Sequence, residues 1–548
     1  MPLTTESEEI PVRIVGSSVF GRYPTISVER TYNMYITTSA DGEEEWLTNF
    51  PGYAQILNLI AGGAEGRGVF HSVRGGFLLA FVAADIFRIN LLSQLPILLG
   101  TISSNTGEVF TAENLSSQIC FIDGLNAYIY NYALAPSAIS PAVYNNVPAD
   151  THFQPNYICY HNTYFIFGNA LKTNFGSQWV IFQTGSDNTL GNAYDLDWVQ
   201  TLALQTKSDF ALAAIRIPGK GNNILVFGST VAEIWSNVGG APVYQRNSSI
   251  NIDYGAASIA TIAANDEYVV WLAINENSSP SLMVSKGGSA ERISTDGLDP
   301  LFERVNFPKL STAFLYRQGG HSFYILSFID PTDNFTIMYD FTKKRIYDLT
   351  DWDGSVFPAR QIVYYNNKQY FISFKDGGIY EINSDFTTYD VFAAYDSFYS
   401  AEIYDYDIPR IRVTNTYRIE GRPEKFKVKM FTFVIESGTT LDAYDTPYCF
   451  GYILNEVTNQ PIYTEDGVPI LMEGGYCYTN KPRVDLTISK NGGNTFSNVV
   501  SYELKKTGQF KNQPRWNNLG YAQQIGYQMR FWGKGRLVVK NGMMEIGN

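Results

Sequence analysis

Residues 368–382 read KQYFISFKDGGIYEI. Two runs in which apolar and polar residues alternate flank Asp376-Gly377-Gly378, a tripeptide that tolerates a positive φ angle. Alternation with a period of two on both sides of such a turn predicts a β-hairpin. The alternation gives each face three residues: Tyr370, Ile372 and Phe374 on one face, and Gln369, Phe371 and Ser373 on the other. Because Phe371 makes the second face apolar as well, the sheet is expected to be buried on both sides.

The same pattern recurs six more times along the chain. Strand–turn–strand phrases start near residues 75, 117, 162, 222, 266 and 321, and the quoted stretch near 368 is the last of them. A spacing of roughly 42–60 residues, filled by strands alone, is typical of the blades of a β-propeller. Seven hairpins are compatible with seven blades, or with six blades and one inserted hairpin.

The pattern divides the chain into three parts. Residues 1–60 show no regular alternation and are expected to be an irregular segment, whereas the hairpins predict a propeller over 61–400. Residues 401–548 are interpreted as a smaller β-sandwich-like domain. Within it, the insert at 441–482 is rich in Tyr, Pro and acidic residues, and we expect it to project as a β-arm in which YCFGYIL pairs with PILMEGGYCY. The predicted fold class is all-β.

Composition excludes several classes of protein. No apolar run is long enough to span a bilayer, and the N-terminal MPLTTESEEIPV lacks the apolar region of a secretory signal. Four cysteines are too few for a fold built on disulfides. Cys120 and Cys159 lie in strand patterns and are expected to be core thiols. Cys449 and Cys477 lie 28 residues apart in one segment, and the sequence leaves open whether they pair.

The net charge of −13 is distributed unevenly. From Lys481 to the end there are eleven Lys or Arg residues and three acidic ones, so the rest of the chain is strongly acidic. Such an asymmetry indicates two surfaces that meet different partners. We expect cations of the C-terminal part to form an assembly interface, and the candidates are Lys505, Lys506, Lys511, Arg515, Arg530, Lys534 and Arg536.

Motifs of catalysis and of metal or cofactor binding are missing from the sequence. It contains no HExxH, P-loop or GxSxG motif and no GxGxxG after a strand. The four histidines, His71, His152, His161 and His321, lack the spacing of metal ligands. SKNGGNTF at 489–496 resembles the aspartate box of sialidases, a structural turn, with Asn491 in place of Asp. We therefore expect no enzyme activity, no cofactor and no metal site.

Nucleic-acid binding is an alternative explanation for the basic C-terminal part. Lys505, Lys506 and Lys511 alternate with aromatic residues up to Trp516, as cations and aromatic rings do in proteins that bind single strands. However, nothing resembles an RNP motif, and the chain as a whole is acidic. The assembly interface is therefore the favoured hypothesis.

Phrases along most of the chain, in order, resemble the packaged-DNA stabilisation proteins of short-tailed bacteriophages, also called tail accessory or tail-hub proteins. The phrases are Tyr32-Asn33-Met34, Asn49-Phe50-Pro51-Gly52, Gly66-Arg67-Gly68-Val69, ILVFGSTVAEIWS (224–236) with the stretch from Ile252 to Ala256, LTISKNGGNTFS (486–497), and RWNNLGYAQQIGYQMRFWGKGRLVV (515–539). The insert at 441–482 is longer than the usual connection of that family.

The resemblance implies a structural virion protein of the phage tail, assembled in the host cytoplasm. In that family six copies form a β-propeller ring beneath the portal and its adaptor. The ring holds the packaged double-stranded DNA, lines the ejection channel and carries spikes, fibres or a needle. An acidic lumen would pass DNA without gripping it. The alternative is a carbohydrate-binding or carbohydrate-cleaving propeller of a phage or cell surface.

Overall fold

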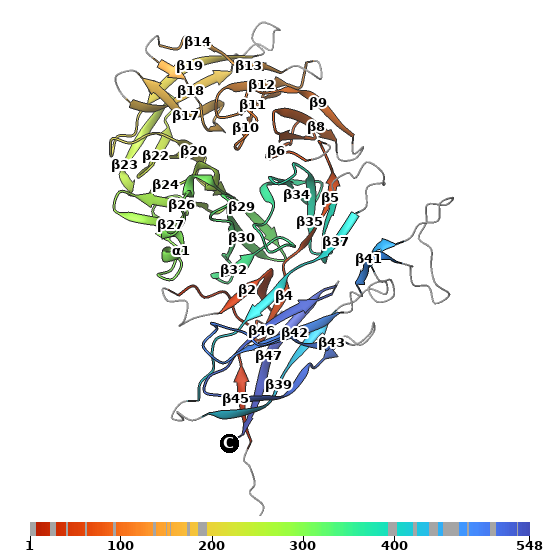
Figure 1. The fold of residues 1–548 in the computed structure, drawn as a ribbon. Coiled ribbons are helices and arrows are strands. Elements are labelled where there is room, and N and C mark those ends of the chain that lie inside the picture. The colour runs from red at the N-terminus through yellow and green to blue at the C-terminus, as the bar shows by residue number, and fades with distance from the viewer. Residues whose placement is uncertain are drawn as a thin grey trace, which may run out of the picture.

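The computed structural model describes most of the chain: residues 7–21, 29–39, 42–60, 63–90, 95–134, 139–148, 151–153, 155–172, 176–184, 194–392, 403–419, 425–437, 448–452, 471–478, 482–504, 511–533 and 535–547. Almost all regular structure in these residues is β-strand, with a short helix α1 (Asp299–Glu303) and two 3-10 turns, η1 (Ile259–Thr261) and η2 (Pro308–Leu310). Figure 1 shows a ring of sheets joined to a smaller β-domain. The predicted all-β class is confirmed.

Seven consecutive sheets, counted over the described residues, make up the ring, and we number them as blades 1 to 7. Blades 1 to 3 contain β6 (Gly66–Ser72), β7 (Phe77–Val82), β8 (Asp85–Asn90) and β9 (Leu95–Thr101); β10 (Phe110–Glu113), β11 (Gln118–Ile122), β12 (Ala127–Asn131) and β13 (Ile139–Pro141); and β14 (Val143–Asn145), β15 (Thr151–Phe153), β16 (Ile158–His161), β17 (Tyr164–Lys172), β18 (Gly176–Thr184) and β19 (Asp195–Leu202). Blades 4 and 5 contain β20 (Ala213–Arg216), β21 (Asn223–Phe227), β22 (Ala232–Asn237) and β23 (Tyr244–Ile252); and β24 (Gly255–Ala256), β25 (Ala263–Ala264), β26 (Val269–Asn275), β27 (Ser278–Ser285) and β28 (Ala290–Arg292).

Blades 6 and 7 complete the ring and also extend beyond it. Blade 6 contains β29 (Ser311–Gln318), β30 (His321–Phe328), β31 (Phe335–Asp340) and β32 (Arg345–Leu349), and blade 7 contains β33 (Ala359–Tyr365), β34 (Lys368–Ser373) and β35 (Ile379–Asn383). The first five blades are sheets of ring strands alone, whereas these two sheets also take in strands from the N-terminal and C-terminal parts. The blade 7 sheet runs on through β36 (Thr388–Phe392) to β37 (Ile403–Asp407), slightly past the predicted boundary at residue 400.

Each predicted hairpin forms the central strand pair of a blade. The pairs are β7–β8, β11–β12, β17–β18, β21–β22, β26–β27, β30–β31 and β34–β35. In the quoted stretch, Gly377 has a φ of +70°, and the Gly378 amide donates to Asp376 Oδ1 at 3.0 Å. Phe374 lies just past the end of β34 and is half-buried.

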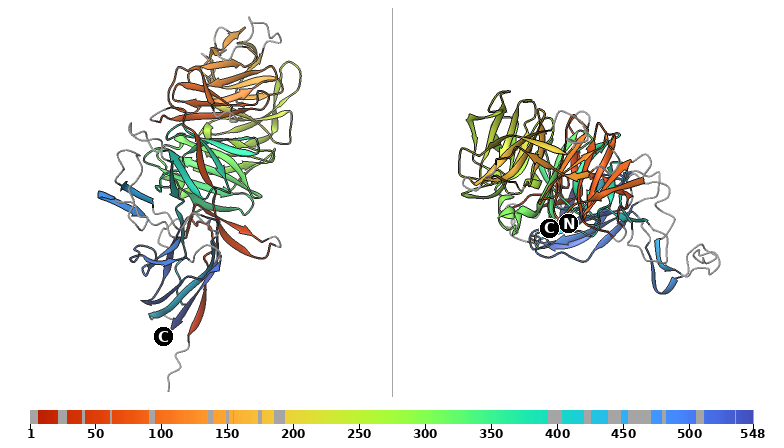
Figure 2. Two further views of the ribbon diagram at one scale, coloured as in Figure 1. Left: turned by 90° about the vertical axis from the view of Figure 1, so that its right-hand side faces the viewer. Right: turned by 90° about the horizontal axis from the view of Figure 1, so that it is seen from above.

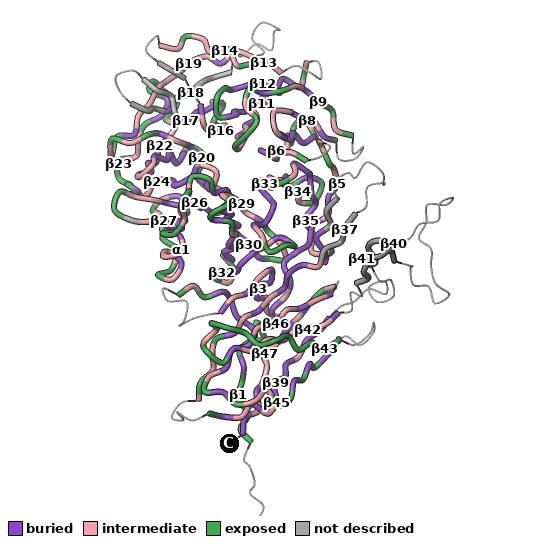
Figure 3. Tube along the Cα trace, in the orientation of Figure 1, coloured by how far each residue is buried: buried purple, intermediate pink, exposed green. Residues whose placement is uncertain are grey.

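The hydrophobic core is a ring of clusters that lie between neighbouring blades, so both faces of each blade are buried (Figure 3). Phe371 belongs to the cluster shared by blades 6 and 7, whereas Tyr370 and Ile372 belong to the one between blades 7 and 1. Aromatic pairs bridge several of these interfaces: Phe81–Phe121 at 5.0 Å, Trp179–Trp235 at 5.2 Å and Phe227–Trp271 at 5.2 Å between ring centroids. Because each blade packs against a neighbour on both sides, the face of the quoted hairpin that carries Phe371 is apolar as well.

The N-terminal segment is not irregular, contrary to the sequence-based expectation. Its described residues form β1 (Glu8–Val12), β2 (Arg30–Tyr32), β3 (Met34–Thr38), β4 (Glu45–Asn49) and β5 (Gly52–Leu57). These strands are short, and all of them except β3, which pairs with the neighbouring β4, pair with a distant part of the chain. In particular, β5 pairs with β35 and is the outer strand of blade 7, so the segment before blade 1 closes the ring.

The C-terminal part is a sandwich of two sheets. One holds β39 (Phe426–Ser437), β44 (Lys511–Asn512), β45 (Arg515–Ala522) and β47 (Leu537–Gly547) together with β1, β3 and β4 from the N-terminal segment. The other holds β38 (Arg410–Val413), β42 (Arg483–Ser489), β43 (Val500–Glu503) and β46 (Gly526–Trp532), and joins blade 6 through β2. Phe431 of the first sheet stacks on Tyr527 of the second, with ring centroids 4.0 Å apart. The predicted sandwich-like domain is confirmed.

The insert contains two strands that pair only with each other among the described residues. They are β40 (Tyr448–Tyr452) and β41 (Leu471–Tyr478), and their antiparallel register places Cys449 opposite Cys477. The predicted pairing of the two phrases is confirmed over these strands. The pair stands away from the sandwich on one flank of the molecule (Figures 1 and 2).

Side chains from blades that are not neighbours meet at the axis of the ring. Glu108, just before β10 of blade 2, accepts hydrogen bonds from Thr312 of blade 6 at 3.3 Å and from Gln361 of blade 7 at 2.5 Å. The buried guanidinium of Arg360 lies beside them and binds Glu65 at 2.8 Å. Because these hydrogen bonds join blade 2 to blades 6 and 7, which are not its neighbours in the ring, they span part of the opening of the propeller.

The axial carboxyl of Glu108 predicts a pH dependence of stability. Burial raises its pKa from 4.5 to about 7, against the opposing effects of Arg360 and the hydrogen bonds from Gln361 and Thr312. A carboxyl with a raised pKa in the folded state stabilises that state most when it is protonated. We therefore expect its contribution to the free energy of unfolding to be full below pH 4.5 and to fall by roughly 1–3 kcal/mol as the pH rises to about 7.

Glu108→Gln, which cannot ionise, should remove this component. Chemical denaturation of both proteins at several pH values across this range measures it. An identical pH dependence for the two proteins would contradict the assignment.

Candidate functional site

The candidate interface cations that the structure describes lie on both sheets of the sandwich or beside them. Lys511 is exposed on β44 and lies 3.7 Å from Glu436. Arg536 is exposed near the start of β47, 3.4 Å from Asp385 of blade 7. Arg515 begins β45 and its Nε contacts the sulfur of Met430. These three belong to the sheet that contains β39, and two of them already have acidic partners in the same chain.

Arg530 lies on the other sheet of the sandwich. Its guanidinium carbon stands 3.8 Å from the centre of the Trp532 ring, and its buried Nε has no acceptor among the described residues. Burial lowers the pKa of Arg530, and the nearby carboxylate of Asp485 opposes this effect. Lys505, Lys506 and Lys534 lie outside the described residues, so their place in the predicted interface stays a prediction.

Around Arg530 the structure forms a charged aromatic platform that the sequence did not reveal. Asp485 accepts hydrogen bonds from Trp532 Nε1 at 2.5 Å and from Ser501 at 2.6 Å, and it pairs with Arg483 at 3.2 Å. The guanidinium of Arg483 also lies 4.9 Å from the Trp532 ring centre. Cation–π contacts on a sheet face, at the base of the insert, suit a contact surface. The antiparallel register of β42 and β46 places Arg483 opposite Trp532 and Asp485 opposite Arg530.

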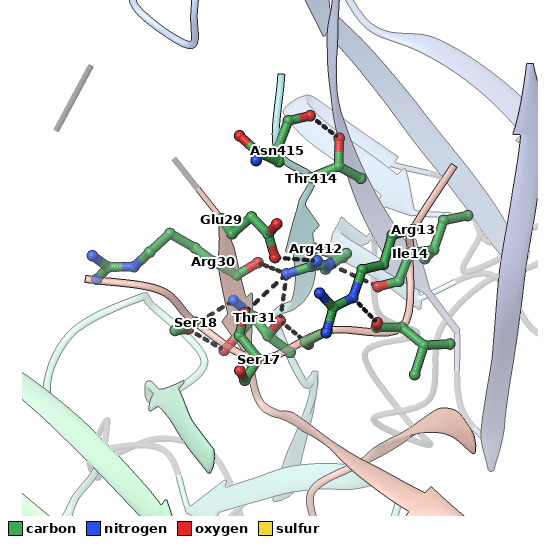
Figure 4. Close-up of polar contacts among 12 residues, drawn as sticks. Arg13, Ile14, Ser17, Ser18, Glu29, Arg30, Thr31, Arg412, Thr414 and Asn415 are labelled. Atoms are coloured by element: carbon green, nitrogen blue, oxygen red, sulfur yellow. Dashed lines mark hydrogen bonds and ion pairs between the residues drawn. The ribbon is translucent and has the colours of Figure 1, made fainter. Parts of the chain in front are cut away.

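The orientation of the sandwich depends on Arg412, whose guanidinium is fully buried between β38 and the N-terminal segment (Figure 4). It donates to the carbonyl oxygens of Ile14 at 2.7 Å and Ser17 at 3.2 Å, and to Thr31 Oγ1 at 3.0 Å. A fourth bond, at 2.9 Å, reaches the carboxylate of Glu29. Burial lowers the pKa of Arg412, and Glu29 opposes this effect.

The same segment is bonded to blade 6 on its other side. Arg30 binds Asp348 through two nitrogens, at 2.6 and 2.9 Å, and Ser18 donates to Asp348 at 2.6 Å. In the sheet, β2 lies between β32 of blade 6 and β38 of the sandwich. The propeller and the sandwich are therefore joined by one continuous nine-stranded sheet.

Two of the four histidines have hydrogen-bonding partners inside the fold. His321 Nδ1 lies 2.8 Å from Asp340, and His161 lies within hydrogen-bond distance of the Tyr244 hydroxyl and the Gly221 carbonyl. Cys120 and Cys159 are free thiols. In the part of the chain that the structure describes, no three His, Cys, Asp or Glu residues are grouped so as to hold a metal ion. The helices found there are also too short to cross a membrane.

The fold is a large β-propeller joined to a β-sandwich, which carries a projecting strand pair. A protein-family model described as bacteriophage P22 Gp10, beta-propeller, matches residues 33–387, which is more than half of the chain. The chain belongs to this family of phage structural proteins that stabilise packaged DNA. No curated protein matches the chain.

The match covers the ring and ends before the C-terminal part of the chain. The likeness expected from the sequence is therefore confirmed for the phrases between residues 33 and 387. The phrases at 486–497 and 515–539, and the insert, lie outside the matched residues. Conclusions about the C-terminal domain rest on the structure of this chain alone.

Replacement of Arg412 tests its role in joining the two domains. Arg412→Met would leave the buried Glu29 carboxylate and two carbonyl oxygens without donors, so we expect a loss of about 3–5 kcal/mol in the free energy of unfolding. Arg418→Met is the matched control, because Arg418 is exposed and, among the described residues, donates only to Gln524. Thermal and denaturant unfolding of the two variants measures the difference. A similar stability for both variants would show that Arg412 is not needed at the junction.

Proposed function

We propose that this protein is a tail-hub and head-completion component, several copies of which form a ring below the portal. Support comes from the family, whose members are structural proteins that stabilise packaged DNA. By the resemblance, the ring has six copies, contacts the portal or its adaptor, lines the channel through which DNA is ejected, and anchors spikes, fibres or a needle. Its place is the virion tail, reached by assembly in the host cytoplasm.

One observation carries the proposal beyond family membership. The hydrogen bonds that Glu108 of blade 2 accepts from Thr312 of blade 6 and Gln361 of blade 7 span part of the opening of the propeller. Double-stranded DNA therefore has no passage through a single subunit. A channel that holds and releases the genome must then lie between copies, which makes oligomerisation a requirement of the function.

The charge of the protein supports a channel that does not grip DNA. A net charge of −13 gives phosphate little attraction, and counterion release, which drives most non-specific binding, requires clustered cations. Lys511 and Arg536 are each close to a carboxylate of their own chain. Lys511 and Arg515 remain exposed, and we propose that they contribute to contacts with another copy or with the portal.

Imaging the purified chain alone and together with its portal tests this function. We expect closed rings on the portal and only weak binding to free duplex DNA at physiological salt. Lys511→Ser with Arg515→Ser should weaken docking, whereas Lys309→Ser with Arg345→Ser, two exposed cations of the propeller, should not. Failure to associate with the portal would refute the proposal. Tight, steeply salt-dependent DNA binding that the first pair of substitutions flattens would identify a nucleic-acid clamp instead.

The carbohydrate alternative has one feature in its favour, because Glu65 and Glu108 both lie beside Arg360 at the axis. A glycosidase needs one carboxyl to protonate the leaving oxygen and a second to act on the sugar. Both oxygens of Glu108 already accept hydrogen bonds from Gln361 and Thr312, which leaves the carboxyl poorly placed for this task. Cleavage of a host surface polysaccharide by the purified protein would reverse the preference.

A further inference from the structure

A cleft of about 320 Å³ opens where the propeller, the N-terminal segment and the sandwich meet. Val19 and Phe20 of the N-terminal segment, Leu301 of α1, and Phe496 of the turn before β43 supply apolar walls. Val19 and Phe496 are 42% and 37% exposed, respectively, which is unusual for apolar side chains lining one hollow. All three parts of the molecule thus contribute to a single concave apolar surface.

Two arginines give the cleft its charge. Arg30 stacks on Phe20, at 4.3 Å from the ring centre, and its charge is balanced by Asp348. Arg304, at the end of α1, is exposed and its guanidinium has no acceptor among the described residues. An unpaired arginine beside aromatic and aliphatic walls is a composition typical of strong protein contacts. The occupant that fits is a segment with apolar side chains next to carboxylates.

The insert of this chain has that composition. Residues 441–482 contain six acidic residues, Asp442, Asp445, Glu456, Glu465, Asp466 and Glu473, and one cation, Lys481. Residues 453–470, which connect β40 to β41, carry three of the acids close to Val457, Ile462 and Val468. A strand pair without a third strand is marginally stable alone, so contact with another surface would stabilise β40 and β41.

The insert and the cleft lie on opposite flanks of the molecule. In Figure 1 the strands β40 and β41 stand to the right of the sandwich, whereas α1, which borders the cleft, lies on the left. The view from above in Figure 2 places them on opposite sides as well. Two complementary surfaces on opposite flanks make a head-to-tail contact, which generates a ring when the rotation between copies closes.

We propose that the insert of one copy, through residues 453–470, binds the Arg304 cleft of the next copy. This inference rests on the proposed function in that it names the contact that joins copies of the ring. The occupied cleft would touch the propeller, the N-terminal segment and the sandwich at once. Assembly would thereby add a further contact that holds the propeller and the sandwich together in every subunit.

Binding of a labelled synthetic peptide of residues 453–470 to the full-length chain tests the cleft directly. We expect Arg304→Glu to weaken peptide binding at least tenfold, because it places a carboxylate against the acids of the peptide. Phe496→Ser should also weaken it. The matched controls are Arg216→Glu and Phe210→Ser, which alter an exposed arginine and an exposed phenylalanine elsewhere on the propeller and should leave binding unchanged. Unchanged melting curves for all four variants check that the fold is intact.

Self-association of the full-length chain, measured by sedimentation, provides the second readout. Arg304→Glu and the triple variant Glu456→Lys, Glu465→Lys, Asp466→Lys should each associate less, and a mixture of the two should recover association through the exchanged charges. If the peptide fails to bind, or binds Arg304→Glu as well as Arg216→Glu, the cleft is not its site and this inference is wrong, even if rings form. If the peptide binds as expected but the chain forms no ring with or without portal, the proposed function fails and the cleft assignment stands.

Discussion

The buried guanidinium of Arg412 is the contact on which the arrangement of the two domains depends. A charge removed from water costs several kcal/mol, and only a complete set of partners offsets that cost. Here the partners are one carboxylate, Glu29, and oxygens of Ile14, Ser17 and Thr31, all supplied by the N-terminal segment. The path on which the segment supplies these partners also places β2 beside β38. The charge thus specifies how the chain runs between the propeller and the sandwich.

The N-terminal segment is shared by every large unit of the molecule. One of its strands closes blade 7, another lies between blade 6 and the sandwich, and three more belong to the sheet of the sandwich that contains β39. Neither domain is complete without it, so the propeller and the sandwich are expected to move as one body. For an assembly protein this matters, because a rigid body holds the insert and the Arg304 cleft at a constant separation, which a closed ring requires.

The hairpins of the ring were predictable from the sequence because the information is local. A period of two on each side of a Gly, Asn or Asp turn specifies β34 and β35, and the same holds for the other central pairs of the blades. The strands β1 and β2 of the N-terminal segment were not predictable. Arg30 to Tyr32 pairs with Ile411 to Val413, and the strand at Glu8 to Val12 pairs with residues 542–546, so nothing near these strands in the sequence signals the pairing. A short strand whose partner is distant in the sequence is not followed by a turn sequence that would reveal it.

The candidate site was predicted less well than the fold for a related reason. Counting charges identified Arg530 and Lys511 as cations, but the count could not show that Glu436 faces Lys511 or that Trp532 and Asp485 surround Arg530. Those neighbours come from sheet register across strands. Likewise Arg304 and Phe496 are unremarkable in the sequence, and only the junction of three chain segments makes them the walls of one cleft.

Hydrogen–deuterium exchange across the junction tests most directly whether the N-terminal segment makes the propeller and the sandwich one body. The amides of β2 and β38 should exchange as slowly as those of β30 in blade 6 and β46 in the sandwich, because opening the junction would require both domains to lose structure. Exchange in β2 and β38 that is orders of magnitude faster than in both neighbouring strands would contradict this. It would show that the junction opens by itself and that the two domains are joined by a hinge.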